Sequence, residues 1–393
     1  MKSQVPKVIT RTVFLLSVVS LFNDVASELM YPIMPVYLKS IGFSIVAIGI
    51  LEGVAEATAG LSKGYFGNLS DNTGRRLPFV QLGYGLTALS RILLAAFTAV
   101  PMVFAARLAD RVGKGVRTAA RDAMLSAEAT KETKATVFGF HRSFDTIGAA
   151  VGPLIALLYL YFYPNQYHTL IVVAAVPCLF AVFTTFLVTE KQLEKPEIKN
   201  FGFFSYIKYW KVASNDFKKT VVHLLLFAAV NSADVFLLLF LKEKGYTDIQ
   251  MIGFYVFYNF VYALTAYPIG KLADKIGLLK VIVMGLFLFS LVYVMIGFTT
   301  SIIAMGLLFL IYGLYASCFE STCKAFIASN CKSSETATAI GFYSGFASIT
   351  SLIASTWTGI VWFTFGPQIA LTSSGVLALI NTLYFVFLNK KSN

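Results

Sequence analysis

Charged side chains are scarce in this chain of 393 residues, because Asp, Glu, Lys and Arg together make up only 13% of it. Soluble domains carry about 25% charged residues, so there is too little polar surface to cover the two or three soluble domains expected for this length. Disordered and collagen-like chains are also excluded, since 57% of the residues are hydrophobic and 15% are aromatic. The composition indicates a membrane protein with many spans.

Cysteine is also rare, and the spacing of Cys178, Cys318, Cys323 and Cys331 matches neither a disulfide framework nor a metal site. We therefore expect packed free thiols, no metal and no cofactor. The formal net charge of +12 lies in short segments between apolar runs. That distribution is typical of charges that orient membrane helices, and it predicts no nucleic-acid partner. No cleavable signal peptide is expected, because the first apolar run is too long.

Twelve apolar runs are long enough to cross a bilayer, which takes about 20 residues each. They cover residues 12–38, 44–66, 79–99, 102–125, 136–162, 167–188, 219–241, 249–269, 280–299, 301–326, 336–363 and 368–388. We predict an all-α membrane protein with an N-terminal six-helix bundle (1–188), a lysine-rich cytoplasmic linker (189–218) and a C-terminal six-helix bundle (219–393).

Lysine and arginine are concentrated in the loops on one side of the predicted spans. The other side has only Lys39, Lys242 and Lys244. Because cytoplasmic loops are enriched in basic residues, we predict that both termini and the linker are cytoplasmic. The expected location is the plasma (inner) membrane, where the chain, as a monomer, would contact membrane lipids.

An internal repeat relates the two halves. A constant offset of 203 residues separates Gly67 from Gly270, Asp71 from Asp274 and Gly74 from Gly277. Because each half has an even number of spans, the copies are parallel. Such repeats place a substrate site between the halves, near the midplane of the membrane.

The loop Gly67-Asn-Leu-Ser-Asp71-Asn-Thr-Gly74-Arg75-Arg76, with its weaker copy, resembles the signature loop of the major facilitator superfamily. The resemblance covers essentially the whole chain, and it implies the fold of that superfamily. Asn72 departs from the pattern, since a basic residue usually follows the Asp. The run 136–162 is similar to a motif of antiporters in this superfamily, through Gly139, Gly148, Gly152 and Pro153.

The resemblance implies that these glycines and loop residues belong to a conformational switch. The alternatives are a solvated turn for the loop and ordinary packing of small residues for the run 136–162. The predicted switch residues are Gly67, Asp71, Gly74, Arg75, Gly139, Gly148, Gly152, Pro153, Gly270, Asp274 and Gly277.

Ionisable residues within spans are costly and are usually functional. Asp24 and Glu28 lie four residues apart in the first span, as Glu52 and Glu56 do in the second, so each pair shares one helical face. Two neighbouring carboxylates in a low dielectric cannot both be charged cheaply, which favours proton binding by one of them. Alternatively, these acids neutralise basic residues of the fourth span.

The fourth span carries a stripe of basic residues on one helical face, namely Arg107, Arg111, Lys114, Arg117 and Arg121. Arg107 falls where the superfamily commonly has an arginine thought to help proton transfer. We predict that Arg107 and Arg111 take part in proton coupling, and that Arg117 and Arg121 lie at the cytoplasmic surface. The stripe could instead form buried structural pairs or attract an anion.

A substrate cavity is predicted between this charged half and a more aromatic C-terminal half. Its candidate residues are Asn23, Lys114, Asn231, Asp234, Tyr255, Tyr258, Asn259, Tyr312 and Glu320. The alternative for the aromatic residues is a structural role, in contact with lipid or neighbouring helices. Glu320 and Lys324 could simply neutralise one another across one helical turn.

We predict a secondary transporter with alternating access that exports small amphipathic compounds in exchange for protons. No ATP-binding loop appears, so an ion gradient would drive transport. No enzyme is expected, because the three histidines are scattered and no catalytic cluster stands out. The alternatives are a proton symporter that imports an organic anion, and a non-transporting membrane sensor on the same fold.

Overall fold

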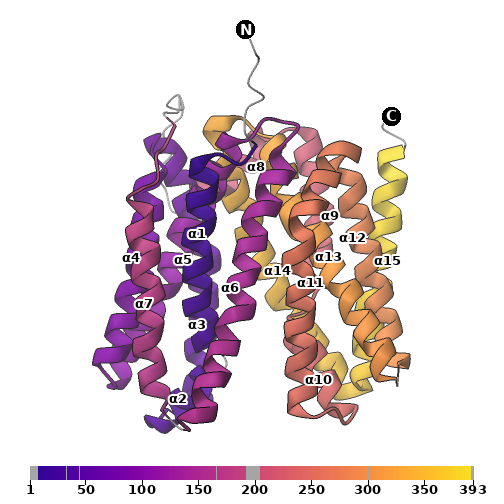
Figure 1. Cartoon of the computed structure of the whole chain (residues 1–393). Coiled ribbons are helices and arrows are strands. Elements are labelled where there is room, and N and C mark those ends of the chain that lie inside the picture. Colours follow the sequence, from indigo (N-terminus) through magenta and orange to yellow (C-terminus); the bar gives the residue numbers. More distant parts are fainter. Residues whose placement is uncertain are drawn as a thin grey trace.

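The computed structural model describes residues 8–31, 33–43, 45–164, 166–191, 204–299 and 301–390. All the regular elements of these residues are helices, arranged as two bundles side by side (Figure 1). Both ends of the described chain lie at one end of the molecule, which we call the terminal end. The end opposite, where α2 and α10 lie, is called the distal end.

The N-terminal bundle comprises α1 to α7, and short helices in the linker lead into the C-terminal bundle. The first bundle contains α1 (Arg11–Met30), α2 (Met34–Ser40), α3 (Ile45–Thr73), α4 (Leu77–Ala96), α5 (Val100–Glu128), α6 (Lys134–Phe162) and α7 (Tyr167–Thr185). The linker contains η1 (Ser205–Lys208) and α8 (Tyr209–Val212). The second bundle contains α9 (Asn215–Ala228), α10 (Val235–Glu243), α11 (Asp248–Ile276), α12 (Leu278–Met295), η2 (Ile296–Phe298), α13 (Ile302–Ser329), η3 (Ser333–Glu335), α14 (Thr336–Phe365) and α15 (Pro367–Lys390).

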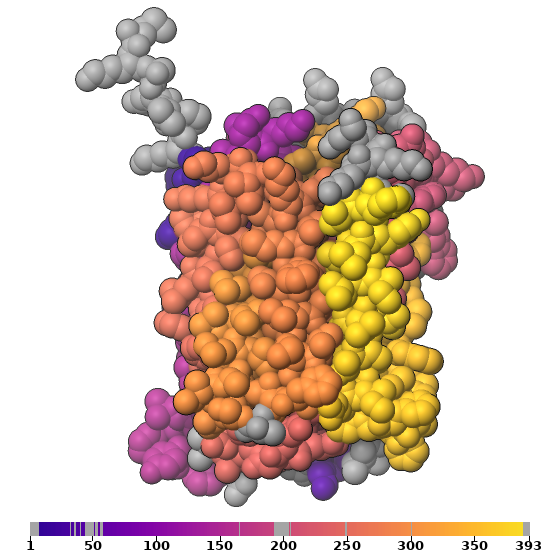
Figure 2. Space-filling model, turned by 90° about the vertical axis from the view of Figure 1, so that its right-hand side faces the viewer, coloured from indigo at the N-terminus to yellow at the C-terminus, as the bar shows by residue number. Residues whose placement is uncertain are grey.

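Each of the twelve predicted spans coincides with one long helix or with a broken pair of helices. Within the described residues, nine helices are long and apolar enough to cross a membrane by length and composition. The other three predicted spans correspond to α3, to the charged α5, and to the pair α9 and α10. Apolar side chains cover the outward face of the C-terminal bundle, as on α15, the yellow helix of Figure 2, where Ile380, Leu383 and Phe387 are exposed.

The first and seventh spans are interrupted, whereas the sequence predicted continuous helices over 12–38 and 219–241. α1 ends at Met30 and α2 begins at Met34, with Pro35 in its first turn. Proline lacks the backbone N–H that a continuous helix needs, which explains this break. The break between α9 and α10 contains Asn231 and Asp234, whose side chains bind tyrosines of other helices.

The two bundles meet through α6 against α11 and α3 against α14. Glycines let these helices approach backbone to backbone, and each half supplies glycines to the contact. A Cβ atom added to Gly270 of α11 would clash with the carbonyl oxygen of Ala135 of α6. A Cβ atom added to Gly67 of α3 would lie 2.5 Å from the carbonyl oxygen of Ala337 of α14. Gly139 of α6 faces Ala266 in the same way, and Gly341 of α14 faces Lys63.

Replacing Gly270 with Ala should separate α6 from α11 and lower the stability of the joined halves. Overpacking of a tight contact costs about 1–3 kcal/mol, so the midpoint of thermal unfolding of the purified protein should fall. Gly253→Ala on the same helix is the matched control, because a Cβ there meets no atom within 4 Å. Equal unfolding midpoints for the two variants would contradict the proposed tight contact.

Candidate functional site

The terminal end holds the two halves together by helix capping across the interface. Asp71, in the last turn of α3, accepts hydrogen bonds from the backbone N–H and the hydroxyl of Thr338, at 2.7 and 2.9 Å. Asp274 of α11 accepts from the backbone N–H groups of Ala135 and Thr136, at 2.9 and 2.7 Å, and from the Thr136 hydroxyl at 2.6 Å. The first N–H groups of a helix lack partners within that helix and attract negative charge. Each half therefore caps a helix of the other half.

The loop after α3 adds an arginine to this contact. Arg76 forms an ion pair with Asp71 at 2.7 Å and donates hydrogen bonds to the carbonyl oxygens of Ala123 and Ser333, at 3.2 and 2.6 Å. Arg75 was the predicted switch arginine of this loop, but its side chain is exposed, while Arg76 is buried. The reason is the direction of the turn at Gly74 (φ +66°), which sends the second arginine of the loop inward.

Only some of the predicted switch glycines lie between the halves. Gly67, Gly139 and Gly270 do so, whereas Gly74 and Gly277 occupy loop turns with positive φ. Gly148 and Gly152 pack against α1 within the N-terminal half, where added Cβ atoms would lie 2.7 Å from α1 backbone atoms. Pro153 follows Gly152 directly in the same stretch of α6. The structure therefore places Gly148, Gly152 and Pro153 within the N-terminal bundle, not between the halves.

Deeper in the interface, a buried network of charges joins α5 and α6 to the C-terminal half. Lys324 of α13 forms an ion pair with Asp122 of α5 at 2.8 Å, and Asp122 is also bound by Arg121 at 2.9 Å. Arg142 of α6 contacts Asp145 at 3.1 Å and donates to the Tyr262 hydroxyl at 2.5 Å. Asp145 and Arg142 were absent from the sequence prediction, although a charged pair inside the apolar run 136–162 is a detectable signal.

Two interpretations of charged residues were wrong. Arg117 and Arg121 are buried rather than at the surface, because that face of α5 turns into the bundle. Arg117 donates to the Thr87 hydroxyl at 2.7 Å and lies over the Tyr84 ring. Lys324 bridges to Asp122 across the interface, so it does not serve mainly to neutralise Glu320 on its own helix.

The predicted proton-coupling acids lie along α1 and α3. Asp24 accepts a hydrogen bond from Asn23 at 3.1 Å. Glu28 is partly exposed and experiences the positive charges of Lys114, Arg111 and Arg142, which come from two other helices. The side chains of Glu52 and Glu56 lie outside the described residues. On α5, Arg107 and Arg111 interact electrostatically with the buried Asp110, which also pairs with Arg91 at 3.5 Å.

In the C-terminal half, the predicted cavity residues gather around the break between α9 and α10. Asp234 accepts hydrogen bonds from the hydroxyls of Tyr258 and Tyr312, both at 2.7 Å. Asn231 donates to Tyr315, which the prediction omitted, at 3.2 Å. The Tyr255 and Tyr258 rings meet edge to face at 5.5 Å between centroids. These groups form an aromatic and acidic surface.

Three predicted cavity residues differ from this group in their surroundings. Asn259 donates to the carbonyl oxygen of Tyr255 on its own helix. Glu320 is half-buried and lies within electrostatic reach of both Arg142 and Asp234, which places it between the two halves. Lys114 is exposed. Within the part of the chain that the structure describes, no group of His, Cys, Asp or Glu side chains could hold a metal ion.

Hydrogen bonds and ion pairs between the halves run from the terminal end, through Asp122 and Lys324, to Arg142 and Tyr262. Lys134, for example, donates to the carbonyl oxygen of Ala328 at the terminal end. Such an arrangement joins two parallel bundles at one end around charged and aromatic residues. It defines a membrane transporter built from two six-helix repeats.

The chain belongs to the Major Facilitator Superfamily, whose family model matches residues 16–258 and 248–393. It is 29% identical over 386 residues to the uncharacterized MFS-type transporter MJ1317 of Methanocaldococcus jannaschii, covering 97% of this chain and 95% of that protein. It is 23% identical over 300 residues to the multi-drug resistance efflux pump PmrA of Streptococcus pneumoniae, covering 73% of each chain. The structure of the E. coli fucose:proton symporter FucP has the same fold, with a TM-score of 0.79 at 13% identity and coverage of 95% of this chain and 98% of that chain.

Substituting Lys324 with Gln should destabilise the protein, because it removes one of the two basic partners of the fully buried Asp122. Leaving a buried charge without any partner costs about 3–5 kcal/mol, and the cost here should be smaller because Arg121 remains. A double-mutant cycle with Asp122→Asn, followed by thermal unfolding, should therefore show that the double variant loses less than the sum of the single variants.

The pair Lys191–Glu128, 3.4 Å apart, gives the matched control, because its lysine is exposed. Lys191→Gln should cost less than about 1 kcal/mol. Additive effects of the Asp122 and Lys324 substitutions would show that the two side chains do not interact.

Proposed function

We propose that the protein is a secondary active transporter that exports small amphipathic compounds in exchange for protons. The observation that carries the proposal is the interface itself. Its helix-capping contacts at the terminal end are reciprocal, and charged side chains of both halves, Asp122 and Lys324, pair deeper in the interface. An interface of this kind can open at one end while it closes at the other.

The proposed orientation, with the terminal end in the cytoplasm of a plasma membrane, is supported by the basic residues in the loops at that end. In that orientation the structure is closed toward the cytoplasm. The monomer would expose its site to the outside in this state and to the cytoplasm after the contacts of Asp71 and Asp274 have separated. The domains proposed are the two bundles, 1–188 and 219–393, joined by the linker 189–218.

Proton coupling is assigned to the acids and bases of the N-terminal half. Glu28 faces Lys114, Arg111 and Arg142, so its ionised form draws α5 and α6 toward α1. Protonation would remove that attraction and weaken the position of Arg142, which also binds Tyr262 of the other half. A substrate that competes for the same charges would bind one protonation state better, and such differential binding is what couples two fluxes.

The substrate class follows from the two unlike walls of the site. Asp234 with its tyrosines offers ring faces and hydrogen bonds, while the opposite half offers charges of both signs. A compound with an aromatic body and a polar group suits both walls. The likeness to PmrA, named as a multi-drug resistance efflux pump, supports export.

A second candidate function is proton-coupled import of an organic anion. The exposed Lys114 near Glu28 favours it, since a cationic group beside an acid can bind a carboxylate and a proton together. The likeness to FucP, named as a fucose:proton symporter, supports symport.

The test is proton flux in vesicles containing the purified protein and a dye that reports internal pH. With an imposed pH gradient, ethidium as an amphipathic cation should drive proton movement in the exchange direction, whereas benzoate should not. Proton movement with benzoate alone, in the same direction as benzoate uptake, would contradict the exporter and support the symporter. Absence of flux with either probe and with a panel of amphipathic compounds would overturn the transport cycle.

Glu28→Gln should reduce the coupled proton flux to the level of empty vesicles, because it fixes the side chain in its neutral form. Glu132→Gln is the control, since Glu132 is exposed in the loop before α6 and should leave the flux unchanged. Normal coupled flux in a folded Glu28→Gln protein would remove Glu28 from the mechanism.

A further inference from the structure

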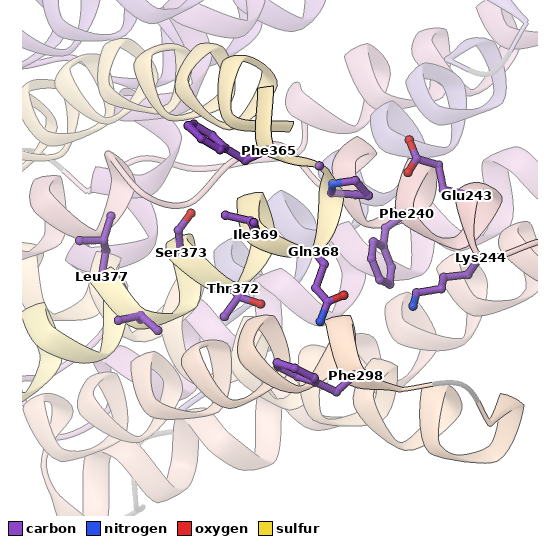
Figure 3. Close-up of a pocket in the computed structure, with 13 residues that line it drawn as sticks. Phe240, Glu243, Lys244, Phe298, Phe365, Gln368, Ile369, Thr372, Ser373 and Leu377 are labelled. Carbon is purple, nitrogen blue, oxygen red and sulfur yellow. The ribbon is translucent and has the colours of Figure 1, made fainter. Parts of the chain in front are cut away.

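A groove at the distal end of the C-terminal half lies away from the candidate site. It has a volume of about 850 Å³ and lies between α10, η2 and the start of α15 (Figure 3). We call it the α10–α15 groove. Its size falls within the range of about 300–1,000 Å³ that is usual for small-molecule sites. It is independent of the proposed transport function.

Most of the lining is apolar and faces outward. Phe298, Phe365 and Ile369 are each more than half exposed, and Val376 and Leu377 continue this surface along α15. Figure 3 shows Leu377 at one end of the groove and Lys244 at the other. From Pro367 to Leu377 the helix rises by about 15 Å, which is about one leaflet of a bilayer's hydrocarbon core.

The end of the groove nearest the distal surface is polar. The Lys244 ammonium lies over the Phe240 ring and donates to the carbonyl oxygen of Gly297 at 3.4 Å. Beside it lie Gln368 and the N-terminus of α15, where free N–H groups favour an anion. Thr372 also belongs to this wall, but its hydroxyl oxygen is buried beside Gly297 of η2 and does not open to the groove.

Glu243 balances the positive charge of Lys244 in the lining of the groove. Glu243 accepts a hydrogen bond from the Trp362 indole at 3.0 Å, and its carboxylate lies on the other side of Phe240 from Lys244 (Figure 3). The formal charges of the lining therefore cancel, with the positive and negative groups separated in space. An anionic headgroup would match only Lys244, whereas a zwitterionic headgroup would match both charges.

The repeat shows that this polar end is particular to the C-terminal half. By the offset of 203 residues, Ile41 stands where Lys244 would be expected, and by the offset of 202 residues that relates α6 to α14, Pro164 stands where Gly366 is. Gly366 has φ +90°, a backbone conformation that Pro cannot adopt, and it forms part of the groove wall. The residues that form the polar end of the groove are therefore not repeated in the N-terminal half.

We propose that the α10–α15 groove binds one zwitterionic aminophospholipid from the leaflet at the distal end. Lys244, Gln368 and the free N–H groups at the start of α15 hold its phosphate, and Glu243 holds its primary ammonium. One acyl chain lies along Ile369, Val376 and Leu377. The complex uses the membrane's own lipid as a ligand and needs no soluble partner.

The test uses the full-length protein in vesicles of equal parts phosphatidylethanolamine and phosphatidylglycerol, followed by mild detergent extraction and native mass spectrometry of retained lipid. The wild-type protein should retain one phosphatidylethanolamine in preference to phosphatidylglycerol. Lys244→Gln should lower retention of both lipids about fivefold, since one lysine near a phosphate contributes about that factor. Glu243→Gln should shift the preference toward phosphatidylglycerol, because the lining then has a net positive charge.

Ser373→Trp, which fills the groove without changing charge, should abolish retention. Lys39→Gln is the matched control, because Lys39 is exposed at the distal end of the other half. Thermal unfolding establishes that each variant is folded, and Ser373→Trp tests the site independently of the charged residues. The proposal is overturned if the wild type retains no lipid, if folded Ser373→Trp retains as much as wild type, or if Glu243→Gln leaves the preference unchanged.

Discussion

The structure depends on two carboxylates that bind helix N-termini in the opposite half of the molecule. Asp71 binds the start of α14, and Asp274 binds the start of α6. In each case the carboxylate satisfies N–H groups that the helix itself leaves without partners. The interface at this end therefore combines directional polar contacts with buried apolar side chains of both halves, such as Val137 and Ile340.

The buried charges beyond the caps extend this logic into the bundle. Asp122 and Lys324 compensate one another across the interface, and Arg142 links Asp145 to Tyr262. Buried ion pairs are weak contributors to stability once desolvation is counted. In the proposed transport cycle, these pairs would separate and re-form as the two halves move.

The fold followed from the sequence because spans, loops and repeats leave strong local signals. The twelve apolar runs and the 203-residue offset between Asp71 and Asp274 required no knowledge of tertiary contacts. The side-chain partners did not follow. Lys324 had an acid one turn away on its own helix, and nothing local showed that Asp122 of α5 would lie nearer. Arg121 looked like a surface residue because its depth depends on how α5 packs against α1 and α6.

The equivalence of the glycine contacts in α6 and α14 also could not be predicted from the sequence. Gly341 faces Lys63 as Gly139 faces Ala266, but 202 residues separate Gly139 from Gly341, one fewer than the offset found in the loops. That single-residue difference hid the correspondence from a search at fixed offset. The shared geometry becomes visible only once the helices are packed.

Each bundle supplies one carboxylate that caps a helix of the other bundle, and one helix N-terminus that the other bundle caps. The two bundles therefore recognise one another through two equivalent contacts. These caps are separate from the segment that connects the bundles, although Tyr206 of that segment also packs between α3 and the C-terminal half. Two separately synthesised pieces would carry complementary docking information within the same bilayer, much as the two subunits of a symmetric dimer do. An ancestral pair of six-helix proteins could therefore have assembled through these contacts before a single chain joined them.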